Sequence, residues 1–191
     1  VSDRQMNALP TFQQSILSDP FCDDVIKLAS ELDQEKGTID DGVTDSVRRS
    51  TVRWINRDER SEFVYQILTR LFEDFNRQVF GFNIGHVPEI QFTEYGESEQ
   101  GHYDWHLDTI SDGPVTYDRK LSMSIQLSPS TSYVGGDLQF HDNGSGGLPA
   151  DEIRSRGTVI VFPSFMPHRV TPVTQGKRLS LVAWMEGPKF Q

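Results

Sequence analysis

The first stretch of helical spacing in the chain begins just after Ser18. Apolar residues recur from Phe21 to Leu32 at intervals of three and four, which is the pattern of one buried helix face. Ser18 is a capping residue, and Pro20 near the first turn favours a helix start. We expect this helix to run on to Gly37, because glycine commonly ends helices.

A second helical pattern opens at Asp58 and Glu59 and continues to Phe75 on one broad apolar face. Between the two helices, residues 51–55 are β-branched and aromatic, which predicts a short strand. Residues 1–86 are therefore predicted to be mostly helical and to support the rest of the chain.

From Val87 onward the apolar residues follow the shorter period of strands. Strands are predicted at residues 90–95, 101–108, 120–127, 137–141, 158–162, 169–173 and 178–185. Turns rich in Gly, Pro, Ser and Asn separate them, and Gln175-Gly176 is the last of these turns. Short strands at close spacing indicate a β-sandwich or barrel, and the two helices would cover one sheet face. The predicted fold class is α+β with one core.

Composition fits a single globular domain over all 191 residues, with 36% hydrophobic and 24% charged residues. No stretch approaches the roughly 20 apolar residues of a membrane span, and the first ten residues lack the apolar segment of a secretory signal. The net charge of −10 argues against nucleic acid as a partner, because an acidic surface repels phosphates. The single cysteine, Cys22, excludes an internal disulfide and is predicted to be a buried helix thiol, which favours a cytoplasmic location.

Two His-x-Asp pairs, His102/Asp104 and His106/Asp108, lie on one predicted strand. Side chains two positions apart on a straight strand share a face, so either pair can offer two ligands to one metal ion. Two histidines and one carboxylate on one face of the metal are typical of non-haem iron oxygenases. We choose His106 and Asp108 because they end the strand, where the mouth of a barrel would lie. His102 and Asp104 could border the site or form a polar face near solvent.

Residues downstream offer a third ligand and a partner for an anion. His168 lies between an apolar strand, residues 158–162, and the next predicted strand, which suits a third ligand. Arg178 lies among apolar residues, where an unpaired inward charge is costly, so its guanidinium is expected to bind a carboxylate. Ser180 shares the strand face of Arg178 and can donate its hydroxyl to the same carboxylate.

These residues form one ordered series of motifs along the chain. The series is Tyr95, Tyr103-x-x-His106-x-Asp108, Gly135-Gly136-Asp137-Leu138-x-Phe140, Phe162-Pro163, His168-x-Val170, Gly176-x-Arg178-x-Ser180 and Trp184. It resembles the prolyl-4-hydroxylase-like branch of the Fe(II)/2-oxoglutarate-dependent dioxygenases, and is similar in particular to PKHD-type hydroxylases. The resemblance covers about residues 51–186. It implies a double-stranded β-helix, or jelly roll, over residues 87–186, with the N-terminal helices packed on the major sheet.

The resemblance also implies Fe(II) as cofactor, with 2-oxoglutarate and O2 as co-substrates. Three residues match the family's metal ligands: His106, Asp108 and His168. Arg178 matches the residue that pairs with the distal carboxylate of 2-oxoglutarate. Tyr95 matches a tyrosine that lines the co-substrate pocket, although it could be an ordinary core aromatic. Gln126 stands where relatives often carry a tyrosine that reaches the same carboxylate, and Ser124 shares its face as a further lining residue.

The implied activity is hydroxylation of a substrate C–H bond with release of succinate and CO2, possible substrates being peptidyl or free proline. Arg119, Trp184 and His102 are predicted to contact this small-molecule or peptide substrate, although Arg119 beside Asp118 could be a plain surface charge and Trp184 a packing residue. Two alternatives stay open: a metal enzyme that keeps the triad without 2-oxoglutarate, and a catalytically inactive jelly-roll binding module. Arg178 speaks against the first and the complete triad against the second.

Overall fold

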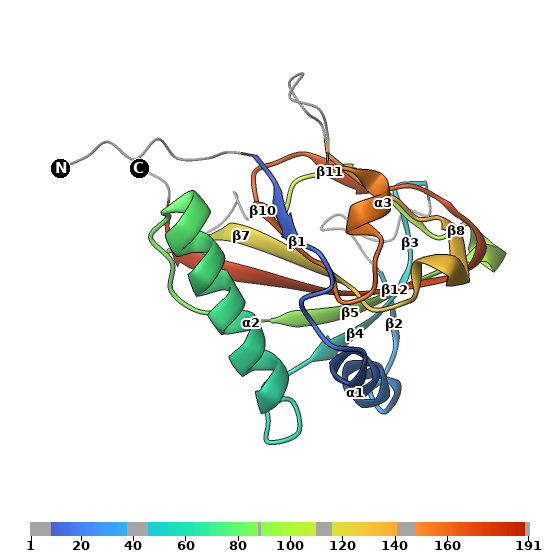
Figure 1. The fold of residues 1–191 in the computed structure, drawn as a ribbon, viewed down its shortest axis with the longest axis horizontal. Helices are drawn as coiled ribbons and strands as arrows, with labels where there is room; N and C mark the ends of the chain where they lie inside the picture. The colour runs from blue at the N-terminus through green and yellow to red at the C-terminus, as the bar shows by residue number, and fades with distance from the viewer. Residues whose placement is uncertain (1–8, 38–45, 88, 110–115, 141–147, 190–191) are drawn as a thin grey trace.

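The core of the protein is a pair of antiparallel β-sheets with two helices on the outer side of the larger sheet (Figure 1). The computed structural model describes residues 9–37, 46–87, 89–109, 116–140 and 148–189. None of the helices in these ranges has the length and apolarity needed to cross a membrane.

The larger sheet is built in the strand order β1 (Thr11–Gln13), β10 (Val159–Pro163), β7 (Tyr117–Gln126), β12 (Val173–Pro188), β5 (Ile90–Gly96), β4 (Thr51–Ile55) and β2 (Glu35–Lys36). A further strand, β8 (Tyr133–Gly135), pairs with the first part of β12. The smaller sheet has the order β3 (Arg48–Arg49), β6 (His102–His106), β11 (His168–Val170) and β9 (Leu138–Phe140). Short helical turns lie at Glu97–Glu99, Ser130–Ser132 and Ala150–Ile153 (α3).

Both predicted helices are present on the larger sheet. Helix α1 (Asp19–Ser30) starts as predicted, because the Ser18 hydroxyl accepts a hydrogen bond from the N–H of Phe21. Cys22 is fully buried in this helix, also as predicted. Helix α2 (Glu62–Phe75) continues as a π-helical turn (Asn76–Phe80) and ends at Gly81, whose φ of 75° is a left-handed conformation that suits glycine.

Alternation along β7 and β12 gives the larger sheet two different faces. Leu121, Met123 and Ile125 of β7 belong to the apolar cluster that contains the buried faces of α1 and α2. The residues between them, Ser122 and Ser124, point to the opposite side, into the space between the sheets. The larger sheet is therefore held by apolar packing on one face and presents polar side chains on the other.

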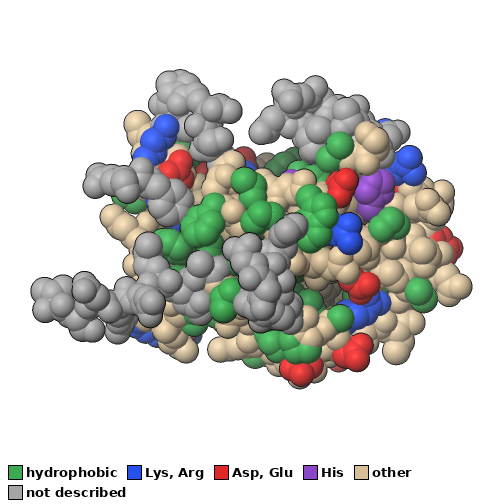
Figure 2. Space-filling model, turned by 90° about the horizontal axis from the view of Figure 1, so that it is seen from above, with side chains coloured by type: hydrophobic (Ala, Val, Ile, Leu, Met, Phe, Trp, Pro, Cys, Tyr) green, Lys and Arg blue, Asp and Glu red, His purple; other side chains and the backbone are tan. Residues whose placement is uncertain are grey.

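A second apolar cluster lies between the two sheets. It contains residues from both sheets and one from α3, namely Tyr95, Tyr133, Leu138, Ile153, Ile160, Phe162, Val170 and Val173. This cluster fills part of the space between the sheets and leaves the rest as a cavity. Figure 2 shows the surface on the side of the smaller sheet, where apolar side chains form several separate groups among polar ones.

Two helix boundaries differ from the sequence-based expectation. Helix α1 ends at Ser30 and not at Gly37, because the chain reverses there and Glu35–Lys36 pairs with β4. Gly37 has a different role, since a Cβ at this position would collide with the Ser50 hydroxyl. Helix α2 starts at Glu62, after a turn in which the carboxylate of Asp58 accepts backbone N–H groups.

The predicted turn at Gln175-Gly176 is wrong. Strand β12 runs through it without a break, because its first part pairs with β8 and its later part with β5 and β7. Gly176 bends the strand with a φ of 70°, and a Cβ there would collide with the carbonyl oxygen of Ser132. Strands β1, β2, β3 and β8 are two or three residues long and were not predicted. The predicted strand at residues 137–141 is β9, and His141 lies outside the described residues.

Candidate metal centre and co-substrate pocket

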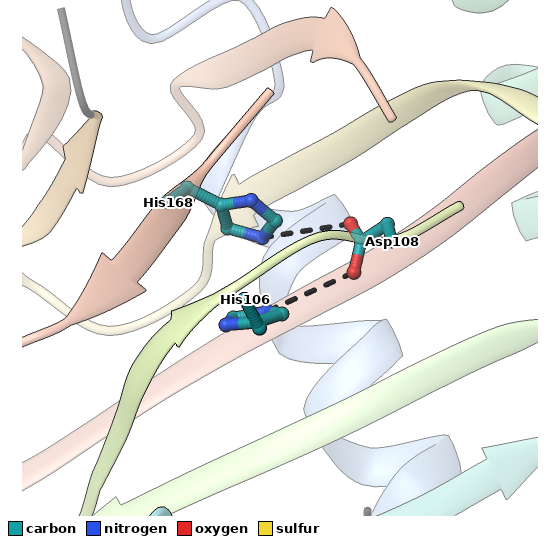
Figure 3. A group of neighbouring side chains, drawn as sticks. All are labelled: His106, Asp108 and His168. Carbon is teal, nitrogen blue, oxygen red and sulfur yellow. Dashed lines mark ion pairs between the residues drawn. The ribbon is translucent and has the colours of Figure 1, made fainter. Parts of the chain in front are cut away.

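His106, Asp108 and His168 converge at one point of the space between the sheets (Figure 3). His106 ends β6 and faces His168, the first residue of β11, in register. Asp108 follows β6, and its carboxylate lies 3.7 Å from Nε2 of His106 and 3.5 Å from Nε2 of His168. The three ligand atoms all lie within 4.8 Å of one another. One metal ion between them would have two imidazole nitrogens and one carboxylate, the donor set typical of non-haem Fe(II).

Each imidazole is oriented by a backbone carbonyl two residues earlier in the chain. Nδ1 of His106 lies 2.7 Å from the carbonyl oxygen of Asp104, and Nδ1 of His168 lies 3.0 Å from that of Met166. We assign the proton to Nδ1 in both rings, since only a protonated nitrogen can donate to a carbonyl. The lone pair of each Nε2 then faces the Asp108 carboxylate, as a metal ligand requires.

Two buried serines hold the Asp108 carboxylate. The Ser122 hydroxyl donates to Oδ2 of Asp108 at 2.6 Å, and the Ser164 hydroxyl lies 3.0 Å from that of Ser122. The backbone N–H of Asp108 donates to the carbonyl oxygen of Ser164 at 2.9 Å. Both serines are fully buried, so the position of Asp108 is fixed by the larger sheet although the residue follows a strand of the smaller one.

The electrostatics of the centre favour the protonation states that bind metal. Burial, followed by the neighbouring His168, lowers the pKa of His106 to about 4. Burial by itself would raise the pKa of Asp108, but the two imidazoles and the Ser122 hydroxyl bring it below its ordinary value. At neutral pH the His106 imidazole is therefore neutral and Asp108 is a carboxylate.

A β-bulge separates the two His-x-Asp pairs. His106 pairs with His168 and Tyr103 pairs with Val170, so Asp104 and Trp105 together stand opposite one residue of β11. The bulge shifts the alternation, and Tyr103 now shares the cavity face with His106.

The first pair lies apart from the cavity for this reason. The ring nitrogens of His102 lie 2.9 Å from the carbonyl oxygen of Gln100 and 3.3 Å from that of Ser46. The carboxylate of Asp104 is exposed and accepts the N–H of Trp105. Neither residue lines the cavity, so the predicted substrate contact of His102 is not supported by its position.

A cavity of about 730 Å³ extends from the three ligands between the sheets. Arg178 also lines this cavity and is 1% exposed. Its Nε donates to the amide oxygen of Gln126 at 3.2 Å, and its Nη1 lies 3.4 Å from the Ser180 hydroxyl. Its Nη2 is buried and has no hydrogen-bond partner among the described residues. A buried unpaired donor on a cation is costly, and a carboxylate such as the distal one of 2-oxoglutarate fits it.

The other predicted co-substrate residues surround this guanidinium. Tyr95 lines the cavity, with its ring centroid 5.6 Å from Cζ of Arg178. Ser124 and Ser180 line the cavity as well. Gln126 is not one of the lining residues. Its amide holds Arg178 in place, which is a different role from that of the tyrosine it replaces.

Arg119 and Trp184, predicted to contact substrate, both line the cavity beside the metal ligands. The Arg119 guanidinium lies 3.9 Å from the Trp184 ring, and its Nη2 lies 3.3 Å from the Glu89 carboxylate. Nε of Arg119 is buried and has no hydrogen-bond partner in the described parts of the chain, whereas the buried indole N–H of Trp184 interacts with the Asp108 carboxylate and helps to lower its pKa.

Several lining residues were missed by sequence reasoning. They include Arg48, Trp54, Gln91, Thr93 and, as a site residue, Tyr103. Arg48 lies in a polar segment that gave no periodic signal, because β3 is only two residues long. Trp54 and Gln91 lie on correctly predicted strands, so their face could have been inferred from alternation once a cavity-facing neighbour was known.

Comparisons with known proteins agree with this geometry. The sequence model of the 2OG-Fe(II) oxygenase superfamily matches residues 90–186. A PKHD-type hydroxylase of Alteromonas mediterranea is 31% identical over 100 residues, which cover 50% of this chain and 42% of that protein. A PKHD-type hydroxylase of Hyphomonas neptunium is 36% identical over 89 residues, covering 44% and 37%. The matched part thus spans less than half the length of these curated relatives.

Two solved structures show the same fold at low sequence identity. A Pseudomonas putida prolyl-4-hydroxylase has a TM-score of 0.72 and 19% identity, covering 95% of this chain and 94% of that one. A Trichoplax adhaerens prolyl hydroxylase in complex with a peptide fragment of the hypoxia inducible factor oxygen degradation domain has a TM-score of 0.74 and 18% identity, covering 94% and 84%. They confirm the double-stranded β-helix that the sequence predicted. With the family model matching just over half of its residues, the chain belongs to the 2OG-Fe(II) oxygenase superfamily, whose cofactor Fe(II) and co-substrates 2-oxoglutarate and O2 are those the sequence predicted.

Proposed function

We propose that this protein hydroxylates a substrate C–H bond in an Fe(II)- and 2-oxoglutarate-dependent reaction that releases succinate and CO2, and that peptidyl or free proline is the first substrate to test. One observation carries the proposal. One cavity is lined both by the three metal-binding side chains and by an arginine with an unpartnered N–H. That is the arrangement needed to hold 2-oxoglutarate between the metal and the cation.

His106, Asp108 and His168 would hold the iron. When bound, Fe(II) supplies the activation of O2 that is coupled to the oxidative decarboxylation of 2-oxoglutarate. Arg178 and Ser180 would bind the distal carboxylate, and Gln126 keeps the Arg178 fork in place through its amide oxygen. His168, His106 and the Ser122 hydroxyl keep the Asp108 carboxylate ionised, and the Ser122 hydroxyl also orients it.

The substrate is proposed to enter beside Arg119 and Trp184. The unpartnered Nε–H of Arg119, on a side chain that lies over the Trp184 ring, can donate to an oxygen acceptor of the substrate. The peptide named with the Trichoplax prolyl hydroxylase supports peptides as one substrate class to test. We also propose that residues 1–191 form one domain, with residues 87–186 as the catalytic jelly roll.

The first experiment adds Fe(II) and 2-oxoglutarate to the protein without oxygen. A weak visible charge-transfer band is expected, and it should be lost or need much more 2-oxoglutarate in Arg178→Ala. The second experiment measures succinate release in air with proline peptides, free proline and small metabolites. Metal binding without the band would favour a metal enzyme that does not use 2-oxoglutarate. Absence of metal binding would favour an inactive binding module, and either result would overturn the proposal.

A further inference from the structure

The ring of His106 is one layer of a stack of three side chains. The Tyr103 ring lies parallel to the His106 imidazole, with centroids 3.5 Å apart and planes 10° apart. The Arg48 guanidinium carbon lies 4.5 Å from the centroid of the same Tyr103 ring. An imidazole this close fills one face of the phenol, so the guanidinium lies over the other face. The order of the layers is Arg48, Tyr103, His106.

The outer layer of the stack is itself held rigidly. Arg48 is only 8% exposed, its Nε donates to the Ser50 hydroxyl at 2.9 Å, and its Nη2 donates to the amide oxygen of Gln91 at 2.9 Å. Gln91 is buried on β5, and its amide oxygen also accepts the Thr93 hydroxyl. The Arg48 guanidinium is thus tied to the larger sheet, while its backbone pairs with Tyr103 in the smaller sheet.

The β-bulge at Asp104 and Trp105 makes this stack possible. On a regular strand, residues three apart point to opposite faces, so Tyr103 and His106 could not meet. The extra residue brings both rings to the cavity side.

The two histidine ligands need different support. The His168 ring packs against Phe162, with centroids 4.6 Å apart, and lies 6.2 Å from the Phe140 ring. His106 ends its strand and retains 13% side-chain exposure, against 7% for His168. The Asp104 carbonyl decides which nitrogen of His106 carries the proton, and the His168 ring touches the imidazole at a tilt, with centroids 4.1 Å apart and planes 54° apart. Neither contact lies flat on a face of the His106 ring. A flat layer on one face restricts how the ring can turn.

We propose that Arg48 and Tyr103 are positioning residues for the metal: Arg48 presses the Tyr103 ring onto the His106 imidazole and so fixes the direction of its Nε2. Arg48 orients the imidazole through the Tyr103 ring. The inference rests on the proposed function only in that His106, Asp108 and His168 bind a metal ion. Its test therefore measures metal binding and does not need turnover.

The probe is Co(II), added to the metal-free protein and followed by its visible d–d absorption, which reports both affinity and ligand geometry. Arg48→Met is expected to weaken Co(II) binding about ten-fold and to change the d–d spectrum. Residues that orient metal ligands typically contribute about 10- to 100-fold to metal affinity, and the expected loss is at the lower end of that range. Tyr103→Phe keeps the ring and should bind Co(II) like the parent protein. Tyr103→Leu should lose at least as much affinity as Arg48→Met.

A matched control lies on the other face of the same strands. Arg169 is adjacent to His168, and its guanidinium lies 4.7 Å from the ring of Trp105, which is adjacent to His106. Arg169→Met removes the same kind of cation–ring contact equally close to the ligands, and should leave Co(II) affinity and spectrum unchanged.

The double variant Arg48→Met/Tyr103→Leu separates positioning from independent effects. If Arg48 acts through the ring, the double variant binds Co(II) no more weakly than Tyr103→Leu alone. Fully additive losses would overturn the proposal, and so would an Arg48→Met variant with the parent's affinity and spectrum.

Should Arg48→Met fail to fold, as judged by thermal unfolding without metal, Arg48→Lys replaces it. Lysine keeps the charge but has no planar group to lay on the ring, so weakened Co(II) binding is again expected and unchanged binding contradicts the idea. A parent protein that binds Co(II) yet releases no succinate with Fe(II) contradicts the proposed function alone.

Discussion

The two sheets contribute to the site in different ways. The larger sheet supplies Arg178, Ser180 and Ser124 from neighbouring long strands, β12 and β7, whose cavity-facing positions follow plain alternation. The smaller sheet supplies His106 and His168 from strands of five and three residues. A bulge separates this residue pair from the neighbouring pair, Tyr103 and Val170. The co-substrate end therefore depends on regular strand geometry, whereas the metal end depends on particular local contacts.

This difference indicates where each end is vulnerable. A regular ladder places a side chain by many equivalent backbone hydrogen bonds, so a substitution at the Arg178 end is expected to leave the path of the strand and the metal ligands unchanged. At the metal end, one carbonyl, one serine or one stacked ring decides the direction of a ligand. We expect the two ends to respond separately to substitution, and the following variants test that expectation.

The largest effect is expected for Asp108→Ala. Binding of Fe(II) or Co(II) should weaken by more than about 100-fold, because even partners outside the ligand set contribute about 10- to 100-fold. Succinate release should be abolished, as it should be when a chelator removes the metal. Asp104→Ala, the carboxylate of the other His-x-Asp pair, is the matched control and should bind metal normally. Equal losses in both variants would show that the bulge does not separate the two pairs.

Arg178→Ala should act on the co-substrate end alone. The 2-oxoglutarate concentration for half-maximal charge-transfer absorbance is expected to rise by about 10- to 100-fold, since hydrogen bonds to charged groups are worth about 1.5–3 kcal/mol and about 1.4 kcal/mol is ten-fold. Co(II) affinity without 2-oxoglutarate should stay as in the parent. Arg119→Ala, another arginine of the same cavity, should leave the 2-oxoglutarate titration unchanged. A joint loss of metal and 2-oxoglutarate binding in Arg178→Ala would mean that the two ends are not separate.

Ser122→Ala tests a side chain of the larger sheet that contacts a metal ligand directly. Loss of its hydroxyl removes the 2.6 Å hydrogen bond to Asp108, and metal affinity should fall about ten-fold, as for other outer partners. Ser124→Ala, two residues along the same strand face, has no hydrogen bond to Asp108 and should bind metal normally. Competition with a chromophoric chelator measures both, and equal affinities in the two variants would remove Ser122 from the support of the centre.

The smallest effect is expected outside both ends, at Glu186. Glu186 lies on β12, opposite Arg119 of β7. Burial raises the pKa of its carboxyl group. A raised folded-state pKa means that stability is lost as pH rises through it, so the ionised glutamate destabilises the fold at pH 8. Glu186→Gln should therefore melt at a slightly higher temperature than the parent at pH 8, and the difference should disappear near pH 4. Exposed Glu152→Gln should show no such pH dependence, and metal and 2-oxoglutarate binding should be unchanged in both variants.

Much of the site could be inferred from the sequence because it depends on alternation and on the cost of a buried charge. An arginine among Leu, Val and Trp, two residues before a serine on the same strand face, predicted an anion site. Arg178 and Ser180 both line the cavity, and Nη2 of Arg178 has no hydrogen-bond partner among the described residues. The helix starting after Ser18 and the strand at residues 51–55 follow equally local rules.

What the sequence left open was decided by contacts between distant segments. The bulge that separates His102 from His106 exists because β6 pairs with β11, some 60 residues later, and no local pattern marks it. Arg48 reaches the stack because β3 pairs with β6, although its own segment is polar and aperiodic. The predicted turn at Gln175-Gly176 became part of a strand because β8 supplied a partner. Alternation and burial act between neighbours in the chain and can be inferred from it, whereas register and bulges are set by strand pairing across the fold and appear only once the two sheets have formed.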